Sequence, residues 1–272
     1  KEGLQDLSIT RTNFSWGIPF PLNKDHVVYV WFDALLSYLS GAGKEQEFWP
    51  ANVHLLGKDN GWFHTVIWPA MLLSAKEKLP KTVFIHGFLT FNGQKISKSL
   101  GNVISPDYLV NKYSSDSIRY YVLRNFVFGE DGDFSEKVLA ERHNNELANK
   151  LGNLVSRVAS LAEKYGTEGT EKSDNKLLKK LKLKKIEKHI ETFEFDKALN
   201  EIFAFIDLCN EYVQSNKIWE TKDRKALYEL KESILKIAEL LWPFIPKTSE
   251  KIKKQFSAKN IKKGEILFKK IE

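Results

Sequence analysis

Apolar residues recur at steps of three and four over most of the chain that follows Phe134. This spacing places apolar side chains along one face of an α-helix, whereas a half-buried strand would alternate them. We therefore expect the second half of the chain to be an all-α bundle, with a connecting segment at residues 166–174. The expected helices begin at Ser135, near Asp174 or Asn175, near Asp196, near Asp223 and near Lys247, and Pro243 and Pro246 end the fourth of them.

The first third of the chain follows another pattern, in which short apolar runs alternate with a helical stretch. Residues 27–32, 53–56 and 82–85 are typical of strands, and residues 61–75 have helical spacing. This alternation favours an α/β layer with parallel strands. We expect a domain boundary near residue 135, which gives an α/β domain at 1–135 and a helical domain at 136–272.

Composition narrows the class of protein. The 272 residues are 42% hydrophobic and carry a formal net charge of +7, so the chain can fill packed cores and would attract a polyanion. The single cysteine, Cys209, lies in an apolar stretch and cannot form an intrachain disulfide or a multi-cysteine zinc site. We therefore expect no zinc site. Because no apolar run approaches 18 residues and no signal peptide is evident, we expect a cytoplasmic protein without a membrane segment.

The segment 91–102 contains lysines, serines and glycines around Ile96. Ammonium groups, hydroxyls and accessible backbone N–H groups can together surround phosphate oxygens. The spacing does not fit a P-loop, which requires G-x-x-x-x-G-K-[ST]. From composition alone, a solvated surface turn is an equally ordinary interpretation of this segment.

The run from Lys95 to Ser99 resembles the Lys-Met-Ser-Lys-Ser signature of class I aminoacyl-tRNA synthetases, with Ile96 in place of methionine. Further blocks resemble the methionyl-tRNA synthetase family in particular, and the resemblance extends from Asp6 to about Trp219. They lie at residues 8–12, 16–19, 29–34, 57–60, 63–64, 68–72 and 86–88. The resemblance implies the second half of a Rossmann-type parallel sheet followed by an anticodon-binding helix bundle.

In that family methionine is adenylated with Mg·ATP, pyrophosphate leaves, and the methionyl group passes to tRNA(Met). The resemblance implies catalytic roles for Lys98, Lys95 and Arg11, because cationic groups stabilise the departing pyrophosphate and the carboxylate. The implied ATP-binding residues are Gly57, Asp59, His86, Lys95, Ser97 and Lys98. No other cofactor or metal is implied.

The implied methionine pocket contains Trp31, Tyr38, Asn60 and His64, an aromatic surface suited to a soft, weakly polar thioether. Two positions depart from relatives, since Leu35 replaces a proline and Asn60 replaces an isoleucine. Without the resemblance, Trp31 would be interpreted as an ordinary core residue.

The implied anticodon-reading residues are Asn153, Arg157 and Trp219. The first two are four residues apart and share one helical face, and an exposed tryptophan can stack on a nucleotide base. Ile218 replaces a proline of some relatives. The lysine-rich stretch 176–188, expected to be one helix, is interpreted as a solvated face; contact with the tRNA backbone or a membrane surface would use the same pattern.

The other signature of the class, a His-Ile-Gly-His-type motif, does not occur in this sequence. We therefore expect the N-terminal half of the synthetase to be a partner or a missing segment, and the chain by itself to be inactive. A tRNA-binding module without catalysis and a synthetase for isoleucine, leucine or valine are the alternatives. Joint retention of Arg11, Asp59, His64 and Lys98 speaks against the first, and the blocks around Trp31 and His64 speak against the second.

Overall fold

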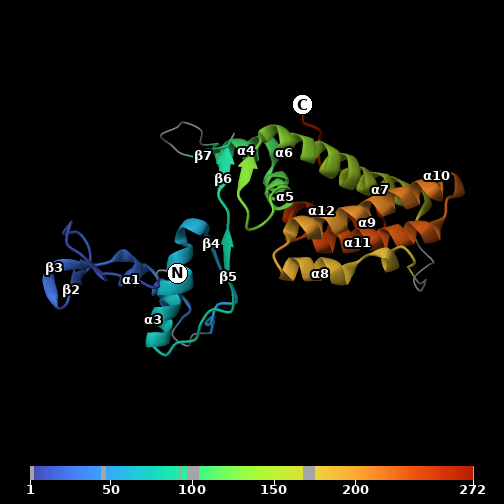
Figure 1. Cartoon of the computed structure of the whole chain (residues 1–272). Coiled ribbons are helices and arrows are strands. Elements are labelled where there is room, and N and C mark those ends of the chain that lie inside the picture. Colours follow the sequence, from blue (N-terminus) through green and yellow to red (C-terminus); the bar gives the residue numbers. More distant parts are fainter. Residues whose placement is uncertain (1–2, 44–46, 92, 97–103, 168–174, 272) are drawn as a thin grey trace. The chain divides into compact units, whose positions relative to one another are not determined.

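A computed structural model describes residues 3–43, 47–91, 93–96, 104–167 and 175–271. The chain divides into two compact units, unit 1 (Lys1–Gly87) and unit 2 (Phe88–Glu272), and each is described by itself (Figure 1). Among the described helices, none combines the length and the apolar character that crossing a membrane requires.

Unit 1 begins with a small antiparallel sheet in the order β1 (Thr10–Arg11), β3 (Asn23–Val28), β2 (Pro19–Phe20). The prediction of a strand at 27–32 is wrong beyond Val28. The pairing of β3 with β1 ends at Val28, and the helix α1 (Val30–Ala34) follows. A short β-branched and aromatic run fits a strand or a helix equally well, and only the partner strand decides. A second short helix, α2 (Ser37–Gly41), comes next.

The expected parallel pair is present as β4 (His54–Gly57) and β5 (Val83–His86), which lie in register from His54 beside Val83 to Gly57 beside His86. The connection between the strands is helical, as expected. It consists of a 3-10 turn η1 (Lys58–Asn60), a π-helical turn η2 (Phe63–Ile67) and α3 (Trp68–Ser74). Leu35, Ala42, Trp49, Trp68 and Leu72 form the core of this unit.

Unit 2 opens with a second small sheet in the order β7 (Gln94–Lys95), β6 (Leu89–Phe91), β8 (Gly132–Phe134). The strands β6 and β8 are parallel, and α4 (Pro106–Tyr113) and α5 (Ser115–Asn125) lie between them in sequence. We did not expect these two helices from the sequence. Both begin at serine caps, where the hydroxyls of Ser105 and Ser114 accept from backbone N–H groups of the first turn.

The helices expected from Ser135 and near Asp196, Asp223 and Lys247 are present, and the helix expected near Asp174 is divided. The first begins at Ser135, whose hydroxyl accepts from the N–H of Val138, and continues through α6 (Glu136–Arg142), the π-helical η4 (His143–Gly152) and α7 (Asn153–Tyr165). The others are η5 (Leu178–Lys180), α8 (Leu183–Glu191), α9 (Phe195–Ser215), α10 (Ile218–Thr221), α11 (Arg224–Leu241) and α12 (Pro246–Phe256).

The prediction of a single helix at 176–188 is wrong. The chain leaves helical geometry at Leu181, which is extended, and α8 starts only at Leu183. Leu177 is buried and Leu181 packs against the same core. The apolar side chains therefore reach the core from two short elements, an arrangement that helical spacing alone cannot reveal.

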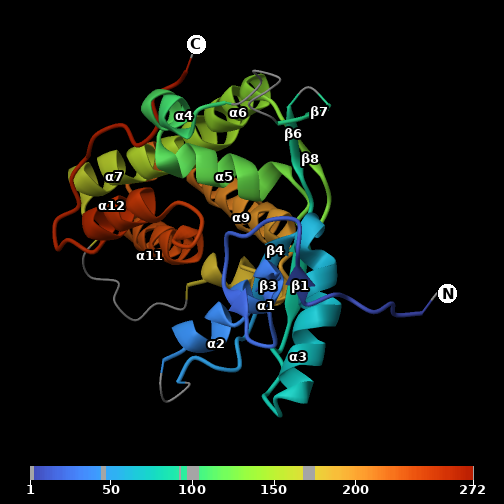
Figure 2. The same ribbon diagram turned by 90° about the vertical axis from the view of Figure 1, so that its left-hand side faces the viewer.

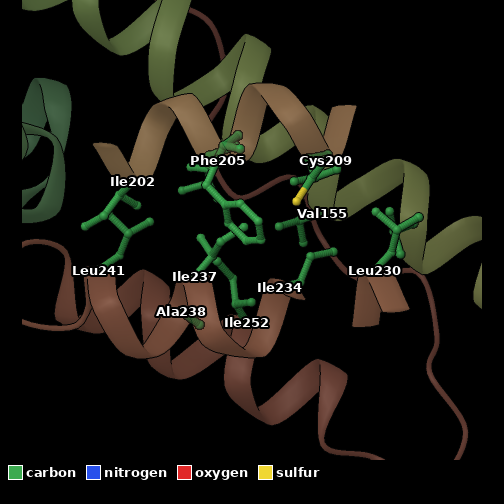
Figure 3. Packing of buried hydrophobic residues seen from close by; sticks show 14 of the residues in the cluster. Val155, Ile202, Phe205, Cys209, Leu230, Ile234, Ile237, Ala238, Leu241 and Ile252 are labelled. Carbon is green, nitrogen blue, oxygen red and sulfur yellow. The ribbon is translucent and has the colours of Figure 1, made fainter. Parts of the chain in front are cut away.

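The helices α7, α9 and α11 run alongside one another in unit 2, and α5 packs against α9 (Figures 1 and 2). Figure 3 shows part of their shared hydrophobic core, with Phe205 and Ile202 of α9 facing Ile237 and Leu241 of α11. Cys209 is a free thiol buried in this core, as its place in an apolar stretch of the sequence predicts. Residues 265–271 form no helix and no strand.

Candidate functional site

An aromatic cluster in unit 1 brings together three of the residues expected to bind methionine. Trp31 comes from α1, Tyr38 from α2 and His64 from η2. The Trp31 ring stacks on Phe63 at a centroid distance of 4.1 Å and meets His64 edge-on at 5.9 Å. Phe63 adds an aromatic wall to which the sequence assigned no role, although it belongs to a block that carried the resemblance.

Hydrogen bonds fix the His64 ring. Its Nδ1 lies 3.0 Å from the backbone oxygen of Asn60, which can only accept, so Nδ1 carries a proton. In neutral imidazole Nε2 then accepts from the Tyr38 hydroxyl, 2.9 Å away. Burial raises the pKa of Tyr38, which keeps this hydroxyl protonated. Asn60 thus contributes through its backbone oxygen.

His54 lies behind this pair and was not identified from the sequence. Its ring centroid is 4.4 Å from that of Tyr38, and its Nε2 accepts from the Trp68 indole N–H at 3.2 Å. Burial lowers the pKa of His54, and the neighbouring His64 lowers it further. A neutral, hydrogen-bonded histidine therefore supports Tyr38 from the core side.

Three of the residues expected to bind ATP meet at the carboxyl ends of β4 and β5. Gly57 pairs with His86 in the parallel register, and Asp59 lies in the turn that follows β4. A Cβ on Gly57 would lie 2.8 Å from Asp59 Oδ1 and 3.6 Å from the His86 ring, so a side chain there would displace the Asp59 carboxylate. The carboxyl ends of parallel strands are where open α/β sheets bind ligands.

Arg11 is held at the edge of the same unit. Its Nη1 donates to the backbone oxygens of Ser8 and Thr10 at 3.0 and 2.8 Å, and its Cζ lies 3.4 Å from the centre of the Tyr29 ring. Tyr29 in turn meets Phe63 edge-on at 6.2 Å. Aromatic contacts therefore connect the Arg11 guanidinium with the stacked Phe63 and Trp31 rings.

The run from Lys95 to Ser99, which we call the lysine loop, begins in unit 2. Lys95 is the second residue of β7, opposite Thr90 of β6, whereas Ser97 and Lys98 lie outside the described residues. The turn before Lys95 is fastened by Asp133 Oδ1, which accepts from the N–H of Gly93 at 2.8 Å and from the Thr90 hydroxyl at 2.7 Å. These bonds, the Gly93 one first, lower the pKa of Asp133.

A groove of about 510 Å³ in unit 2 contains two of the three expected anticodon-reading residues. Arg157 of α7 and Trp219 of α10 line it together with Ser156, Ser160, Leu161, Gln214 and Lys263. Trp219 is 40% exposed. It stands on a four-residue helix whose flanking residues, Lys217 and Lys222, adopt left-handed backbone conformations.

Asn153 lines a neighbouring groove of about 360 Å³. Ser156 lines both grooves, so Asn153 and Arg157 face adjacent parts of one surface, whereas Leu154 and Val158 are buried and line neither groove. The shared face expected from the four-residue spacing is confirmed. The roles of these side chains in binding RNA stay predictions.

Comparisons with known proteins agree with this arrangement. The family model "tRNA synthetases class I (M)" matches residues 1–159, and "Anticodon-binding domain of tRNA ligase" matches residues 174–270. The methionine–tRNA ligase of Thermotoga maritima is 42% identical over 94% of this chain and 44% of its own length, and that of Bacillus subtilis is 41% identical over 94% and 42%.

Among solved structures, the Mycobacterium tuberculosis methionyl-tRNA synthetase in complex with methionyl-adenylate superposes with a TM-score of 0.85 at 35% identity. The match covers 98% of this chain and 59% of that one. The chain spans less than half the length of the two curated relatives named above. The matched family model covers more than half of the chain, and the chain therefore belongs to the methionyl family of class I tRNA synthetases.

Proposed function

We propose that this chain is the part of a methionine–tRNA ligase that supplies the lysine loop, part of the methionine and ATP sites, and the anticodon-binding bundle. The complete enzyme would form methionyl-adenylate from methionine and Mg·ATP and pass the methionyl group to tRNA(Met). The observation that carries this proposal is the Trp31, Phe63, Tyr38 and His64 cluster, whose Phe63 and His64 follow shortly after the turn η1 (Lys58–Asn60).

The cluster suits a thioether side chain. Stacked Trp31 and Phe63 offer a flat apolar wall, and sulfur–aromatic contacts contribute about 0.3–1.5 kcal/mol each. The hydrogen bond between Tyr38 and His64 satisfies the polar atoms nearby. A flexible unbranched side chain can therefore fill this pocket without leaving a buried polar group unpaired.

The nucleotide would lie at the ends of β4 and β5. Gly57 permits close approach of the adenosine, the Asp59 carboxylate can accept from ribose hydroxyls, and the His86 ring can flank the base. Arg11, Lys95 and Lys98 would stabilise negative charge on the carboxylate and the departing pyrophosphate. Catalysis of this kind relies on positioning and charge stabilisation.

The two activities can be separated by substitution in the complete synthetase. Lys98→Ala should slow methionine-dependent ATP–pyrophosphate exchange by about 10²–10³-fold, the usual loss for one preorganised donor to a developing anion. Trp219→Ala should leave exchange unchanged and reduce kcat/KM for tRNA(Met) by about 5–150-fold, equivalent to one lost base stack.

Trp242→Ala is the matched control, because Trp242 is an exposed tryptophan of the same bundle that does not line the Trp219 groove. It should change neither assay. Unchanged exchange in Lys98→Ala, or a loss of exchange in Trp219→Ala as large as its loss of tRNA charging, would contradict the assignment of roles.

An amino-acid panel in the exchange assay tests the substrate. Isoleucine, leucine and valine are included because the class I enzymes for those amino acids share the lysine loop. Methionine should support exchange, and the other three should not.

We also propose that the isolated chain shows no exchange and gains it when the N-terminal half is added. Robust exchange by the isolated chain would overturn that part, and tRNA binding without exchange by the reconstituted protein would favour a binding module.

A further inference from the structure

The segment that follows α12 packs back along the long helix formed by α6, η4 and α7. We call residues 258–271 the strap. Ile261 and Phe268 of the strap are buried, the N–H of Lys263 donates to Glu163 Oε2 at 3.0 Å, and the N–H of Ile271 donates to Asn144 Oδ1 at 2.9 Å. Hydrogen bonds at both ends therefore hold the strap beside the helix.

The strap forms one wall of each groove that contains an expected anticodon-reading residue. Lys263 lines the groove of Arg157 and Trp219, and residues 264–268 line the groove of Asn153. The opposite walls come from α7 and, for the Trp219 groove, from the end of α9 and α10 as well. RNA entering either groove would touch the strap.

The charges at the Trp219 groove favour an anion. Arg157 and Lys263 both line this groove. In the described part of the chain, neither the Arg157 guanidinium nor the Lys263 ammonium lies in an ion pair with a carboxylate.

Two carboxylates limit where that anion can bind. Glu163 of α7 accepts from the N–H of Lys263 but does not line the Trp219 groove, whereas Glu265 of the strap lines the Asn153 groove. A phosphate beside Glu265 would meet like charge, which is unfavourable. The phosphate is therefore assigned to the Arg157 and Lys263 side, and the Asn153 side is left to the base.

We infer that Lys263 of the strap binds a backbone phosphate of the anticodon nucleotide whose base stacks on Trp219, with Arg157 on the facing wall of the groove. This inference rests on the proposed function. Asn153, Arg157 and Trp219 would read the base or stack on it. Lys263 would add a contact to the RNA backbone, and such a contact fixes the position of the nucleotide.

The test is binding of an anticodon stem-loop RNA to the complete synthetase, measured by fluorescence anisotropy across a salt series. Lys263→Ala should raise the Kd about 5–10-fold. This loss lies between the contribution of a screened ion pair and that of a hydrogen bond to a charged group. It should also reduce the slope of log K against log salt by about 0.7, the value for one phosphate contact on a single strand. Lys263→Arg should restore most of the binding.

Lys262→Ala is the matched control, because Lys262 is an exposed neighbour whose carbonyl, and not its ammonium, is bound by Gln255. It should leave the Kd and the salt slope unchanged. Replacing the loop phosphates one at a time with neutral methylphosphonates locates the contact. At one position, the methylphosphonate should weaken RNA binding by the unchanged protein and should not weaken RNA binding by Lys263→Ala.

The outcomes distinguish the two proposals. If Trp219→Ala weakens RNA binding while Lys263→Ala matches Lys262→Ala, the phosphate contact is wrong and the proposed function stands. If no methylphosphonate position loses its effect in Lys263→Ala, the contact is also wrong. If Trp219→Ala and Lys263→Ala both bind RNA as the unchanged protein does, the anticodon role of the bundle fails as well.

Discussion

The hydrogen bond between Tyr38 and His64 joins residues that are 26 positions apart. Resemblance to a family named both residues, because each lies in or beside a short block with a distinctive order of residue types. Phe63 and His54 received no role, although His54 contacts Tyr38 and Trp68. Nothing in the local sequence distinguishes a histidine that supports a pocket from a histidine that packs in a core, since the difference lies only in the neighbours.

His54 makes the stability of unit 1 depend on pH. Because its folded pKa lies below the ordinary value of 6.5, the unfolded chain binds a proton that the folded unit resists. The free energy of unfolding should therefore fall as the pH drops below about 6.5. His54→Gln keeps an acceptor for the Trp68 indole and removes the titration, so it should lose less stability between pH 7.5 and 5.5.

Urea unfolding followed by tryptophan fluorescence measures this difference, since Trp49 and Trp68 lie against His54. His26→Gln, at a partly exposed histidine of the same unit, serves as the control and should follow the unchanged protein. An equally steep pH dependence in His54→Gln would show that other groups cause it.

Cys209 offers a second test on a single side chain. Burial raises the pKa of its thiol to about 12, so almost no thiolate is present at neutral pH. We expect no labelling of the native protein by a thiol reagent within minutes and one labelled thiol per chain in urea, counted by mass spectrometry. Rapid labelling without urea would contradict the packing of α9.

At the scale of elements, the sequence predicted best where local chemistry decides. Ser135 and Asp223 cap α6 and α11, and both starts could be read from a polar residue before an apolar period. The antiparallel sheet around β3 and the break at Leu181 could not. Their cause is a partner strand or a core far away in sequence, and periodicity contains no information about either.

The cap of α11 can be tested directly. Asp223 Oδ1 accepts from the N–H groups of Lys225 and Ala226 at 2.9 and 3.0 Å. Asp223→Ala should lower the free energy of unfolding of unit 2 by about 0.5–2 kcal/mol, whereas Asp223→Asn retains an acceptor and should lose little. Urea denaturation followed by circular dichroism compares them, and equal losses would show that the cap geometry is not responsible.

At the scale of the whole molecule, the resemblance predicted the order of an α/β part and a helical part, and the comparisons confirm that fold class. It could not predict which segments share a groove. Arg157, Gln214 and Lys263 line one groove although more than 100 residues separate the first from the last. Such neighbours follow from the packing of α7, α9 and the strap, and no short motif encodes them.

Unit 2 is also stabilised by contacts between α5 and its last helix, α12. The Asp116 side chain on α5 is buried and its Oδ2 accepts from the N–H and the hydroxyl of Thr248 on α12, each at 2.7 Å. Asp116→Ala would leave both donors without that acceptor, and the free energy of unfolding should fall by about 1–3 kcal/mol.

Asp107→Ala is the control, because Asp107 is exposed on α4 and its loss should change stability by less than about 1 kcal/mol. Urea unfolding of both variants measures the difference. Similar values for the two variants would show that the Asp116 contact contributes little to the unit.

The same long-range contacts have a consequence for synthesis on the ribosome. Asp116, Arg119 and His143 leave the ribosome more than 100 residues before Thr248, Phe244 and Lys269, which bind them in the finished fold. Until those partners emerge, α5 and the start of η4 present unpaired polar groups and an uncovered apolar face. The nascent chain therefore completes unit 2 late, and the interval before completion is when a chaperone can act on it.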